Sequence, residues 1–441
     1  MATADTICAV ATPPGAGGIG IVRVSGPLAM TLARAVLRKL PKARMATLAV
    51  FHDEAGAPVD QGVALFFPAP ASFTGEDVLE LQGHGSPVVL DRLVAALVAQ
   101  GARCARPGEF TERAFLNGKI DLIQAEAVAD LIASAHETAA RAALNTLQGT
   151  FSGMIAALNE RLVAVRTRIE AALDFPEEVE DLATDPLLAA TLRDLAATLQ
   201  TTIRQGHEGR VLNEGARLVI AGPPNAGKST LLNTLAGHDA AIVGPIPGTT
   251  RDIIRERVVM DGLSLDICDT AGLRPTTDPV EQEGVRRAQA AAMAADCILW
   301  LIDDTAGPEP EAPPWPEDRV LRVYTKIDRS GRAAGPCPGG CAISAQTGAG
   351  LASLRAAIGN RLLGPGGTPA GGLFAARRRH IVALEQATAA VVRAQAQQAL
   401  GDALLLAEEL RLASDALGEL TGRLTSDDLL GRIFADFCIG K

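Results

Sequence analysis

The stretch RLVIAGPPNAGKST (217–230) decides the fold of the middle of the chain. An apolar run of strand length leads into a glycine-rich turn that fits G-x-x-x-x-G-K-[ST] and opens a helix. In such a loop the glycines let backbone N–H groups surround phosphates, Lys228 reaches the β and γ phosphates, and the Ser229 hydroxyl binds Mg²⁺. A glycine-rich turn without a ligand is the alternative, but the flanking strand and helix favour phosphate binding.

Strand-like runs alternate with helical segments from about 214 to 362. LSLDICD (263–269), CILWLIDD (297–304) and RVLRVYTK (319–326) are apolar along most of their length. Such runs indicate strands that are covered on both faces, as in a mainly parallel sheet. The Gly/Pro stretch LLGPGGTPAGG (362–372) then closes the region.

Two metal- and phosphate-directed motifs accompany the glycine-rich loop. DTAG (269–272) ends a strand, so we expect Asp269 to face Mg²⁺ through water and the Gly272 N–H to turn toward a γ-phosphate. GTTRD (248–252) places the Thr250 hydroxyl where it can bind Mg²⁺ when the loop closes. The order of these motifs makes a nucleoside triphosphate the expected ligand.

The base is read by two later motifs. In TKID (325–328) the Asp328 carboxylate can accept hydrogen bonds from both N1–H and the exocyclic amine of guanine, a donor pair that adenine lacks. SAQ (344–346) can complete the base pocket. We therefore predict a GTPase domain, because an ATPase or an adenine-specific kinase would leave Asp328 without a role.

The group that orients the attacking water is not the usual one. Leu273 stands where many GTPases carry a glutamine, so another side chain is needed, and Glu281 and Glu283 are the candidates. The Asn225 amide can help to coordinate a monovalent cation where an arginine finger would otherwise act. Loop capping is the alternative interpretation of Asn225.

The segments around this region define the domain organisation. Residues 1 to about 118 read as mixed α/β, whereas about 120–205 and the chain from about 374 onward read as long, Ala-rich amphipathic helices. Two helical blocks of like composition on either side of a complete α/β unit predict one helical domain interrupted by an inserted domain. The last helical pattern, ending in DFCIGK (436–441), predicts an ordered tail.

Composition limits the class of protein. The 441 residues suffice for several domains, and no leader-like or membrane-spanning apolar run is visible, so we expect a cytoplasmic protein. Seven scattered cysteines argue against a disulfide framework, and Cys337 and Cys341 read as incidental thiols. The net charge of −10 disfavours non-specific RNA binding, so an RNA partner needs a local basic patch such as ARRRH (376–380), which reads more simply as a helix start.

Motifs along the whole chain carry a family resemblance. They are GIVRVSGP (20–27), SFTGEDVLELQGHG (72–85), GEFTERAFLNGKIDL (108–122), PNAGKST (224–230), GTTRD (248–252), DTAGLR (269–274) and FCIGK (437–441). With them the chain resembles the MnmE family, also called TrmE, of GTPases in tRNA wobble-uridine modification. The GTPase motifs fit many relatives, whereas their nesting between helices that end in FCIGK is distinctive.

The resemblance implies three domains and a set of ligands. The implied fold is multidomain, α/β plus α: an N-terminal α+β folate-binding and dimerisation domain (1–118), a discontinuous helical domain (119–213 and 365–441) and an inserted P-loop GTPase domain with a mainly parallel sheet (214–364). It also implies K⁺-stimulated hydrolysis of GTP with Mg²⁺, and a reduced folate, 5,10-methylene-tetrahydrofolate or a 5-formyl analogue. The implied partners are a second copy, the FAD-dependent MnmG in a heterotetramer, and tRNA, without a membrane.

Site residues follow from the same resemblance. It implies Arg23, Glu80, Lys119 and Lys441 for the folate, Glu281 for orienting water, and Cys438 as a tail thiol in the modification chemistry, which needs a lowered pKa to act as a nucleophile. Its potassium ligands match Asn225, Gly244, Ile246 and Thr249. The nucleotide- and ion-binding residues that we expect are Asn225, Ala226, Gly227, Lys228, Ser229, Thr230, Gly244, Pro245, Ile246, Pro247, Gly248, Thr249, Thr250, Asp269, Thr270, Ala271, Gly272, Thr325, Lys326, Asp328, Ser344, Ala345 and Gln346.

Two departures and two alternatives remain. Thr325 replaces the usual Asn of the guanine motif, and Pro245 and Pro247 stiffen the loop that should close over the nucleotide. A GTP-switched ribosome-assembly or RNA-binding factor is one alternative function, although no appended RNA-binding module is visible. Folate-dependent methyl transfer with GTP as a regulator is the other.

Overall fold

A computed structural model describes most of the chain. The described residues are 5–174, 183–239, 255–269, 292–307, 313, 315–364, 374–423, 427–435, 437, 438 and 440. Packing divides the chain into two compact units. The first unit combines Met1–Ala129, Leu147–Ala156 and Leu417–Lys441, and the second combines Asp130–Thr146 and Ala157–Ala416.

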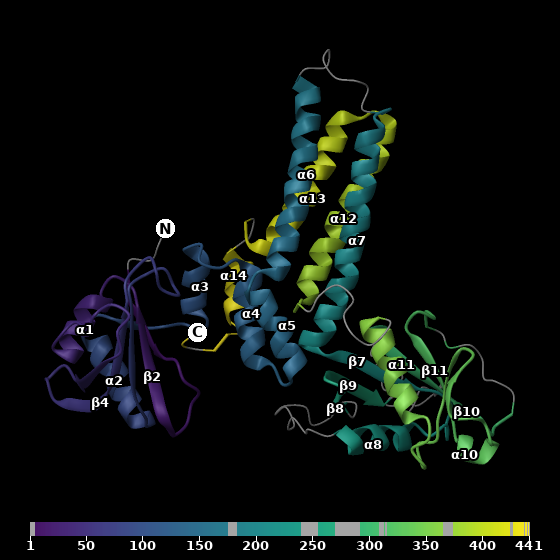
Figure 1. Cartoon of the computed structure of the whole chain (residues 1–441), viewed down its shortest axis with the longest axis horizontal. Helices are drawn as coiled ribbons and strands as arrows, with labels where there is room; N and C mark the ends of the chain where they lie inside the picture. The colour runs from purple at the N-terminus through teal and green to yellow at the C-terminus, as the bar shows by residue number, and fades with distance from the viewer. Residues whose placement is uncertain are drawn as a thin grey trace, which may run out of the picture. The chain divides into compact units, whose positions relative to one another are not determined.

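The first unit is built on a six-stranded mixed sheet. Its strands are β1 (Ile7–Val10), β2 (Gly17–Ser25), β3 (Thr47–His52), β4 (Pro58–Phe67), β5 (Val78–Gly85) and β6 (Arg103–Cys104), in the order β3-β4-β5-β2-β1-β6. Val22 and Val24, two residues apart on β2, are buried on one face. Helices α1 (Ala29–Leu37) and α2 (Pro87–Ala99) cover that face (Figure 1), where Leu32 and Leu93 complete the core.

The end of the chain returns to this unit. Helices α3 (Glu109–Leu116) and α4 (Leu122–Ala133) lead out of the sheet, and α14 (Asp427–Ala435) packs beside them. Phe434 and Phe437 are buried against Leu122 and Ala125. The apolar spacing of the tail therefore produces the ordered helix that the sequence predicts.

Four long helices, which belong to the second unit over most of their length, run side by side (Figure 1). They are α6 (Thr150–Asp174), α7 (Pro186–Glu214), α12 (Arg378–Leu400) and α13 (Ala403–Thr421), and α5 (Glu137–Leu147) precedes them. The Ser414 hydroxyl contacts the Asn159 side-chain oxygen at 2.6 Å although 255 residues separate them. Helices from before and after the α/β region thus form one bundle, which confirms the predicted insertion.

The α/β part of the second unit holds a seven-stranded sheet in the order β12-β13-β11-β10-β7-β9-β8. Its elements are β7 (Ala216–Ala221), α8 (Lys228–Asp239), β8 (Arg255–Met260), β9 (Leu263–Asp269), β10 (Cys297–Asp303), β11 (Val320–Thr325), α10 (Ile327–Ser330), β12 (Gly335–Cys337), β13 (Gly340–Ala342) and α11 (Leu351–Leu363). The five strands β9, β7, β10, β11 and β13 pair in parallel. Apolar cores lie on both faces of β7, with Ile220 in one and Val219 in the other, as the continuous apolar runs predict.

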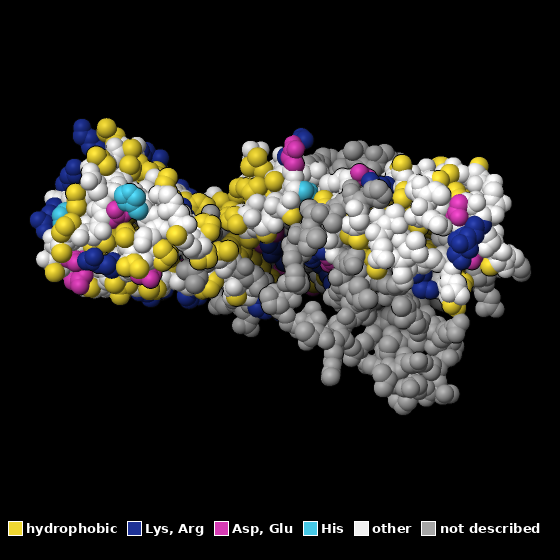
Figure 2. Space-filling model, turned by 90° about the horizontal axis from the view of Figure 1, so that it is seen from below, with side chains coloured by type: hydrophobic (Ala, Val, Ile, Leu, Met, Phe, Trp, Pro, Cys, Tyr) yellow, Lys and Arg dark blue, Asp and Glu magenta, His cyan; other side chains and the backbone are white. Residues whose placement is uncertain are grey.

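Among the residues that the structure describes, no dominant basic patch is visible on the face that Figure 2 shows. The described Lys and Arg side chains lie there in small groups among hydrophobic and acidic ones. Across the ranges that the structure describes, no helix has the length and apolar character needed to cross a membrane.

Candidate functional site

The glycine-rich loop lies at the carboxyl end of β7, between a central strand and α8. Gly222 has φ +146°, and a Cβ there would stand 2.6 Å from the Leu301 carbonyl oxygen of β10. Gly227, with φ +91°, turns the chain into the helix. Both positions therefore need glycine. In open α/β sheets, ligands bind at this carboxyl edge, where strand order reverses.

Lys228 is the first residue of α8, and its ammonium already lies inside the loop. It donates hydrogen bonds to the Gly222 carbonyl at 3.0 Å and the Pro223 carbonyl at 2.9 Å. The N-terminus of α8 adds its own backbone N–H groups at the same place. The loop thus presents the positive charge and the donors that a phosphate chain requires.

Asn225 occupies the tip of this loop in the left-handed region, at φ +62°. Asparagine adopts that conformation more easily than most residues with a side chain, so a loop-shaping role is sufficient to account for it. The other residues expected to hold K⁺ lie outside the described part of the chain.

Thr325 ends β11 and connects three elements. Its hydroxyl contacts the Ala226 carbonyl of the glycine-rich loop at 2.8 Å and the Ile302 carbonyl of β10 at 3.2 Å. Thr325 is 3% exposed, so these contacts are shielded from water. The threonine that departs from the usual asparagine therefore still joins the guanine motif to the phosphate loop.

Asp328 and Ser344 lie together beside the end of the sheet. The Ser344 hydroxyl donates a 2.6 Å hydrogen bond to Asp328 Oδ1 and accepts one from the Thr347 N–H at 3.2 Å. Thr234 of α8 donates to the Ala345 carbonyl at 3.2 Å, while Gln346 is exposed. The structure thus brings TKID and SAQ together, so that the Asp328 carboxylate has a fixed orientation.

The ion pair between Asp303 and Lys326 was not predicted from the sequence. Asp303 ends β10 next to Thr325 of β11, and its Oδ2 accepts a 2.6 Å hydrogen bond from Lys326 Nζ. The sequence did contain a signal for this pair. CILWLIDD and RVLRVYTK predict neighbouring parallel strands, and their acidic and basic ends lie at the same edge of the sheet.

In the first unit, Arg23 of β2 and Glu80 of β5 face each other across the sheet. Arg23 Nε donates to Glu80 Oε1 at 3.0 Å, and the guanidinium lies 5.7 Å from the centre of the Phe110 ring. Phe73, which is 41% exposed, lies on the same guanidinium at 6.0 Å. A donor, an acceptor and an accessible ring therefore meet at one place.

The tail reaches this pair. Arg23 Nη1 donates to the Gly440 carbonyl at 3.4 Å, and the Cys438 carbonyl accepts from the Gly108 N–H at 3.3 Å. Gly440 has φ +92°, and a Cβ there would lie 2.3 Å from the Val10 carbonyl oxygen. The backbone thus seats Gly440 at Arg23, with the exposed Cys438 two residues before it.

Lys119 lies against a loop of the same unit. A Cβ on Gly75 would stand 3.3 Å from Lys119 Cε, so the lysine stem lies against the loop that carries Phe73. The structure brings Arg23, Glu80 and Lys119 to neighbouring elements of the unit, whereas Lys441 lies outside the described residues.

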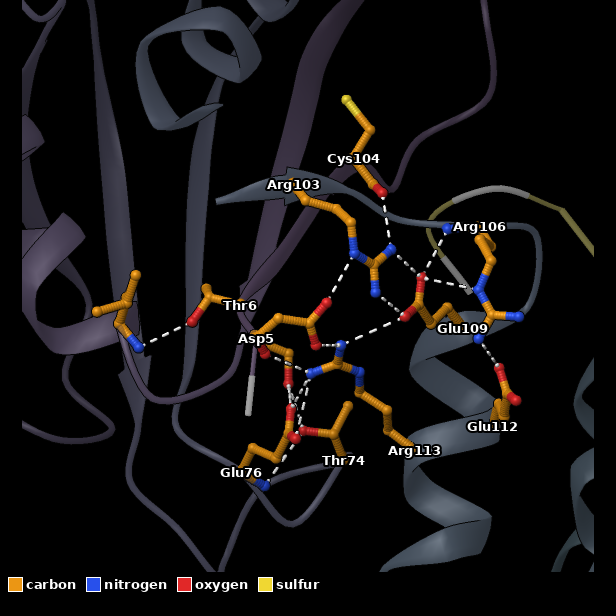
Figure 3. A network of polar contacts seen from close by, with 12 residues as sticks. Asp5, Thr6, Thr74, Glu76, Arg103, Cys104, Arg106, Glu109, Glu112 and Arg113 are labelled. Carbon is orange, nitrogen blue, oxygen red and sulfur yellow. Dashed lines mark hydrogen bonds and ion pairs between the residues drawn. The ribbon is translucent and has the colours of Figure 1, made fainter. Parts of the chain in front are cut away.

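An ion-pair network centred on the buried side chains of Glu109 and Arg113 joins α3 to other segments of the same unit (Figure 3). Arg113 is 4% exposed and pairs with Glu109 at 3.3 Å, Glu76 at 3.1 Å and Asp5 at 2.8 Å. Arg103 binds Glu109 at 2.6 Å from the other side. Burial alone would raise the pKa of Glu109, but the Arg103 guanidinium and the Arg106 N–H more than offset it, so the pKa lies below its usual 4.5.

The network was also missed at the level of sequence. Glu109 and Arg113 stand four residues apart on one face of α3, which is a detectable helical pair. Their partners Asp5 and Glu76 come from distant segments, so spacing along the chain could not have shown the whole cluster.

The basic run ARRRH starts α12 and is partly engaged. Arg377 Nη2 donates to Asp130 Oδ1 at 2.6 Å, and the Arg377 N–H donates to His380 Nδ1 at 3.0 Å. The run does begin a helix, as expected, but Arg377 lies in an ion pair with Asp130 and not on a solvated face.

Several expected site residues lie outside the described part of the chain. They are Gly244, Pro245, Ile246, Pro247, Gly248, Thr249, Thr250, Thr270, Ala271, Gly272, Glu281 and Lys441. Asp269 is described as the last backbone position of β9, opposite Ile220 of β7.

Comparison with known proteins covers the chain from end to end. A family model of the GTP-binding protein TrmE N-terminus matches residues 6–119, and a model of the MnmE helical domain matches residues 122–438. The tRNA modification GTPase MnmE of Alkalilimnicola ehrlichii is 51% identical over 446 residues, which cover 99% of each chain. That of Sodalis glossinidius is 51% identical over 459 residues and all of both chains. By the extent of both matches, this chain belongs to the MnmE family of tRNA modification GTPases.

Proposed function

We propose that the chain is a K⁺-stimulated GTPase that works with the FAD-dependent MnmG. Together they install a carboxymethylaminomethyl-type group at C5 of the wobble uridine of tRNA, with the one-carbon unit taken from a reduced folate. Family membership makes GTP the nucleotide and tRNA modification the process. The observation that carries the nucleotide assignment is the Asp328–Ser344 pair beside a phosphate loop fixed by Thr325.

The base pocket fits guanine by its donors and acceptors. One oxygen of Asp328 is oriented by Ser344, so the carboxylate faces its ligand as a double acceptor, which N1–H and the exocyclic amine of guanine satisfy. A buried or half-buried acceptor pair left without donors would cost binding free energy, so adenine is rejected. The fit is to guanine nucleotides as a class.

The phosphate loop fits the charge of a triphosphate. Lys228 exchanges its contacts with the loop carbonyls for the β and γ phosphates, and the α8 N–H groups hold the phosphates in place. The Ser229 hydroxyl would be one ligand for Mg²⁺, which would neutralise charge on the phosphates. Glu281 orients the attacking water, because Leu273 has no group that can do so.

A potassium ion would add a further positive charge beside the phosphates. Asn225 at the loop tip would supply an amide oxygen, and Gly244, Ile246 and Thr249 would supply the remaining ligands. A cation held there would supply the positive charge of an arginine finger, which is worth on the order of 10³ to 10⁵ in rate. Pairing of two copies would then close the site, in keeping with the proposed homodimer.

A folate fits the first unit through charge and shape. Glu80 accepts the N–H groups of a pterin-like ring, Phe73 offers an accessible aromatic face, and Arg23 with Lys119 balances the acidic tail. Gly440 seats the tail at Arg23 and so brings Cys438 to the same region. This placement supports a modification step at the folate, remote in sequence from the nucleotide motifs.

The decisive experiment is steady-state GTP hydrolysis in K⁺ and in Na⁺ at equal ionic strength over a range of protein concentrations. Strong stimulation by K⁺ that rises with concentration supports the paired-site mechanism. Equal rates in both salts would reject K⁺ stimulation and leave activation to MnmG or tRNA. Mass spectrometry of wobble uridine from cells with and without the protein tests the modification itself and separates it from a ribosome-assembly role.

A further inference from the structure

Asp303 is held on both oxygens at the carboxyl end of β10. Its Oδ2 pairs with Lys326 Nζ at 2.6 Å. Its Oδ1 accepts hydrogen bonds from the Thr305 N–H at 3.0 Å and the Thr305 hydroxyl at 2.7 Å. The carboxylate therefore has one orientation, and so does the ammonium that it binds.

The pair stays charged at physiological pH. Burial would raise the pKa of Asp303, but the Lys326 ammonium and the two Thr305 donors outweigh it and hold the pKa at about 2. The side chains are 16% exposed for Asp303 and 27% for Lys326, so water only partly screens the attraction. An ion pair with additional hydrogen bonds in such a place fixes geometry.

Lys326 has an unfavourable backbone conformation that its neighbours must hold in place. It adopts φ +61° between Thr325 and the helix that carries Asp328, a conformation that costs a residue with a side chain on the order of 1 kcal/mol. Thr325 anchors the backbone on one side through the Ala226 carbonyl. Asp303 anchors the Lys326 side chain on the other side.

A loose ammonium here would also harm base recognition. Lys326 stands two residues before Asp328, whose carboxylate must stay available for two guanine N–H groups. The Arg329 Nε already lies 4.0 Å from Asp328 Oδ2, and an ammonium bound to Asp303 adds no second competitor for that carboxylate.

We propose that Asp303 is a positioning residue for guanine-nucleotide binding, which acts by holding Lys326 away from Asp328. The inference rests on the proposed guanine site and adds a residue that no motif of the sequence assigns. It concerns nucleotide affinity, so Asp303 should affect KM rather than the hydrolytic step.

Asp304 supplies a matched control one residue later. It also carries a half-buried carboxylate with two partners, Arg332 at 2.6 Å and the Ser330 hydroxyl, and Arg332 lies 4.5 Å from the Tyr324 ring centre. Its contacts hold the far end of α10 and leave Lys326 untouched. Asp304→Asn thus removes a comparable ion pair without freeing the Lys326 ammonium.

The experiment compares KM and kcat for GTP, and the affinity for a fluorescent GDP analogue, in the full chain. We expect Asp303→Asn to raise KM and the GDP dissociation constant about tenfold with kcat within twofold, and Asp304→Asn to leave both constants within twofold. Asp303→Glu should recover part of the affinity. Lys326→Met combined with Asp303→Asn should be no worse than Lys326→Met alone.

Two outcomes overturn the inference. One is an unchanged KM in a folded Asp303→Asn protein, and the other is fully additive effects of Asp303→Asn and Lys326→Met. A general structural role would instead lower the melting temperature and kcat and would not respond to Asp303→Glu. Asp328→Asn tests the underlying site separately. If this variant does not shift the preference from guanine to xanthine nucleotides, the proposed guanine pocket is rejected. If it does shift the preference and Asp303→Asn leaves KM unchanged, only the positioning role of Asp303 is rejected.

Discussion

The hydroxyl of Thr325 donates a 2.8 Å hydrogen bond to the backbone carbonyl of Ala226, 99 residues earlier in the chain. One residue belongs to the guanine motif and the other to the phosphate loop, and both are buried. In the proposed guanine-nucleotide site, base recognition and phosphate binding would therefore share this one contact. Replacing a single atom at this contact should therefore weaken the binding of both the base and the phosphates.

Thr325→Val keeps the shape of the side chain and removes the hydroxyl. The buried Ala226 carbonyl loses its donor, which costs about 1 kcal/mol, so we expect the GDP dissociation constant to rise about fivefold. Equilibrium titration with a fluorescent GDP analogue measures it. Thr325→Ser, which retains the hydroxyl, is the control, and equal affinity in the valine variant would show that the contact contributes nothing to binding.

Glu109 should make the first unit sensitive to acid. Its folded pKa lies below 4.5, so the ion pairs stabilise fully at neutral pH, and that stability is lost as the pH falls through the folded pKa. We expect the melting temperature of the wild type to fall more steeply between about pH 5 and 3 than that of Glu109→Gln. At pH 7 the glutamine variant should itself be destabilised by about 3 kcal/mol, the low end for a broken buried ion pair.

The control for Glu109 is Glu112→Gln. Glu112 pairs with Arg106 at 2.9 Å on the exposed side of the same helix, and surface pairs contribute little. Parallel acid profiles for wild type and Glu109→Gln would mean that other carboxylates determine the acid response.

Glu281 should act in hydrolysis and not in binding. Because Leu273 replaces the usual glutamine, Glu281→Ala removes the group that orients water, and we expect kcat to fall by about 10² with GDP affinity unchanged. Glu283→Ala, two residues on, is the matched control with turnover near wild type. An unchanged kcat in Glu281→Ala would show that another residue orients the attacking water.

Sequence spacing brings together the residues of the proposed nucleotide site better than those of the network in the first unit, for a physical reason. Lys228, Asp328 and Ser344 lie in short motifs whose chemistry depends on local spacing, and their strands are marked by continuous apolar runs. Arg113 instead collects Asp5 and Glu76 from segments far apart, and only the sheet register brings them together. The Asp303–Lys326 pair is of intermediate difficulty. Both residues lie at the ends of strands that the sequence predicts, but the order of the strands in the sheet must be known before the two can be paired.

Gly440→Ala should separate the two activities. An added Cβ would lie 2.3 Å from the Val10 carbonyl oxygen at a φ of +92°, so the tail would leave its seat at Arg23. We expect wobble-uridine modification to be lost while GTP hydrolysis is retained, with mass spectrometry and phosphate release as the two readouts. Gly431→Ala in the same tail, where a Cβ meets nothing within 4 Å, is the matched control. Normal modification by Gly440→Ala would show that tail seating is dispensable.

Cys438 allows a test of chemistry at the seated tail. Its backbone is held by Gly108 and its thiol is exposed, so Cys438→Ser changes one atom without disturbing the docking. If the thiolate forms a covalent intermediate, modification should fall by at least about 10² because a serine hydroxyl is a far weaker nucleophile at neutral pH, while GTP hydrolysis stays normal. Cys104→Ser removes the other exposed thiol of the same unit and should leave both activities intact. Wild-type modification by Cys438→Ser would restrict the tail to positioning Gly440 against Arg23 and would rule out covalent catalysis by the Cys438 thiol.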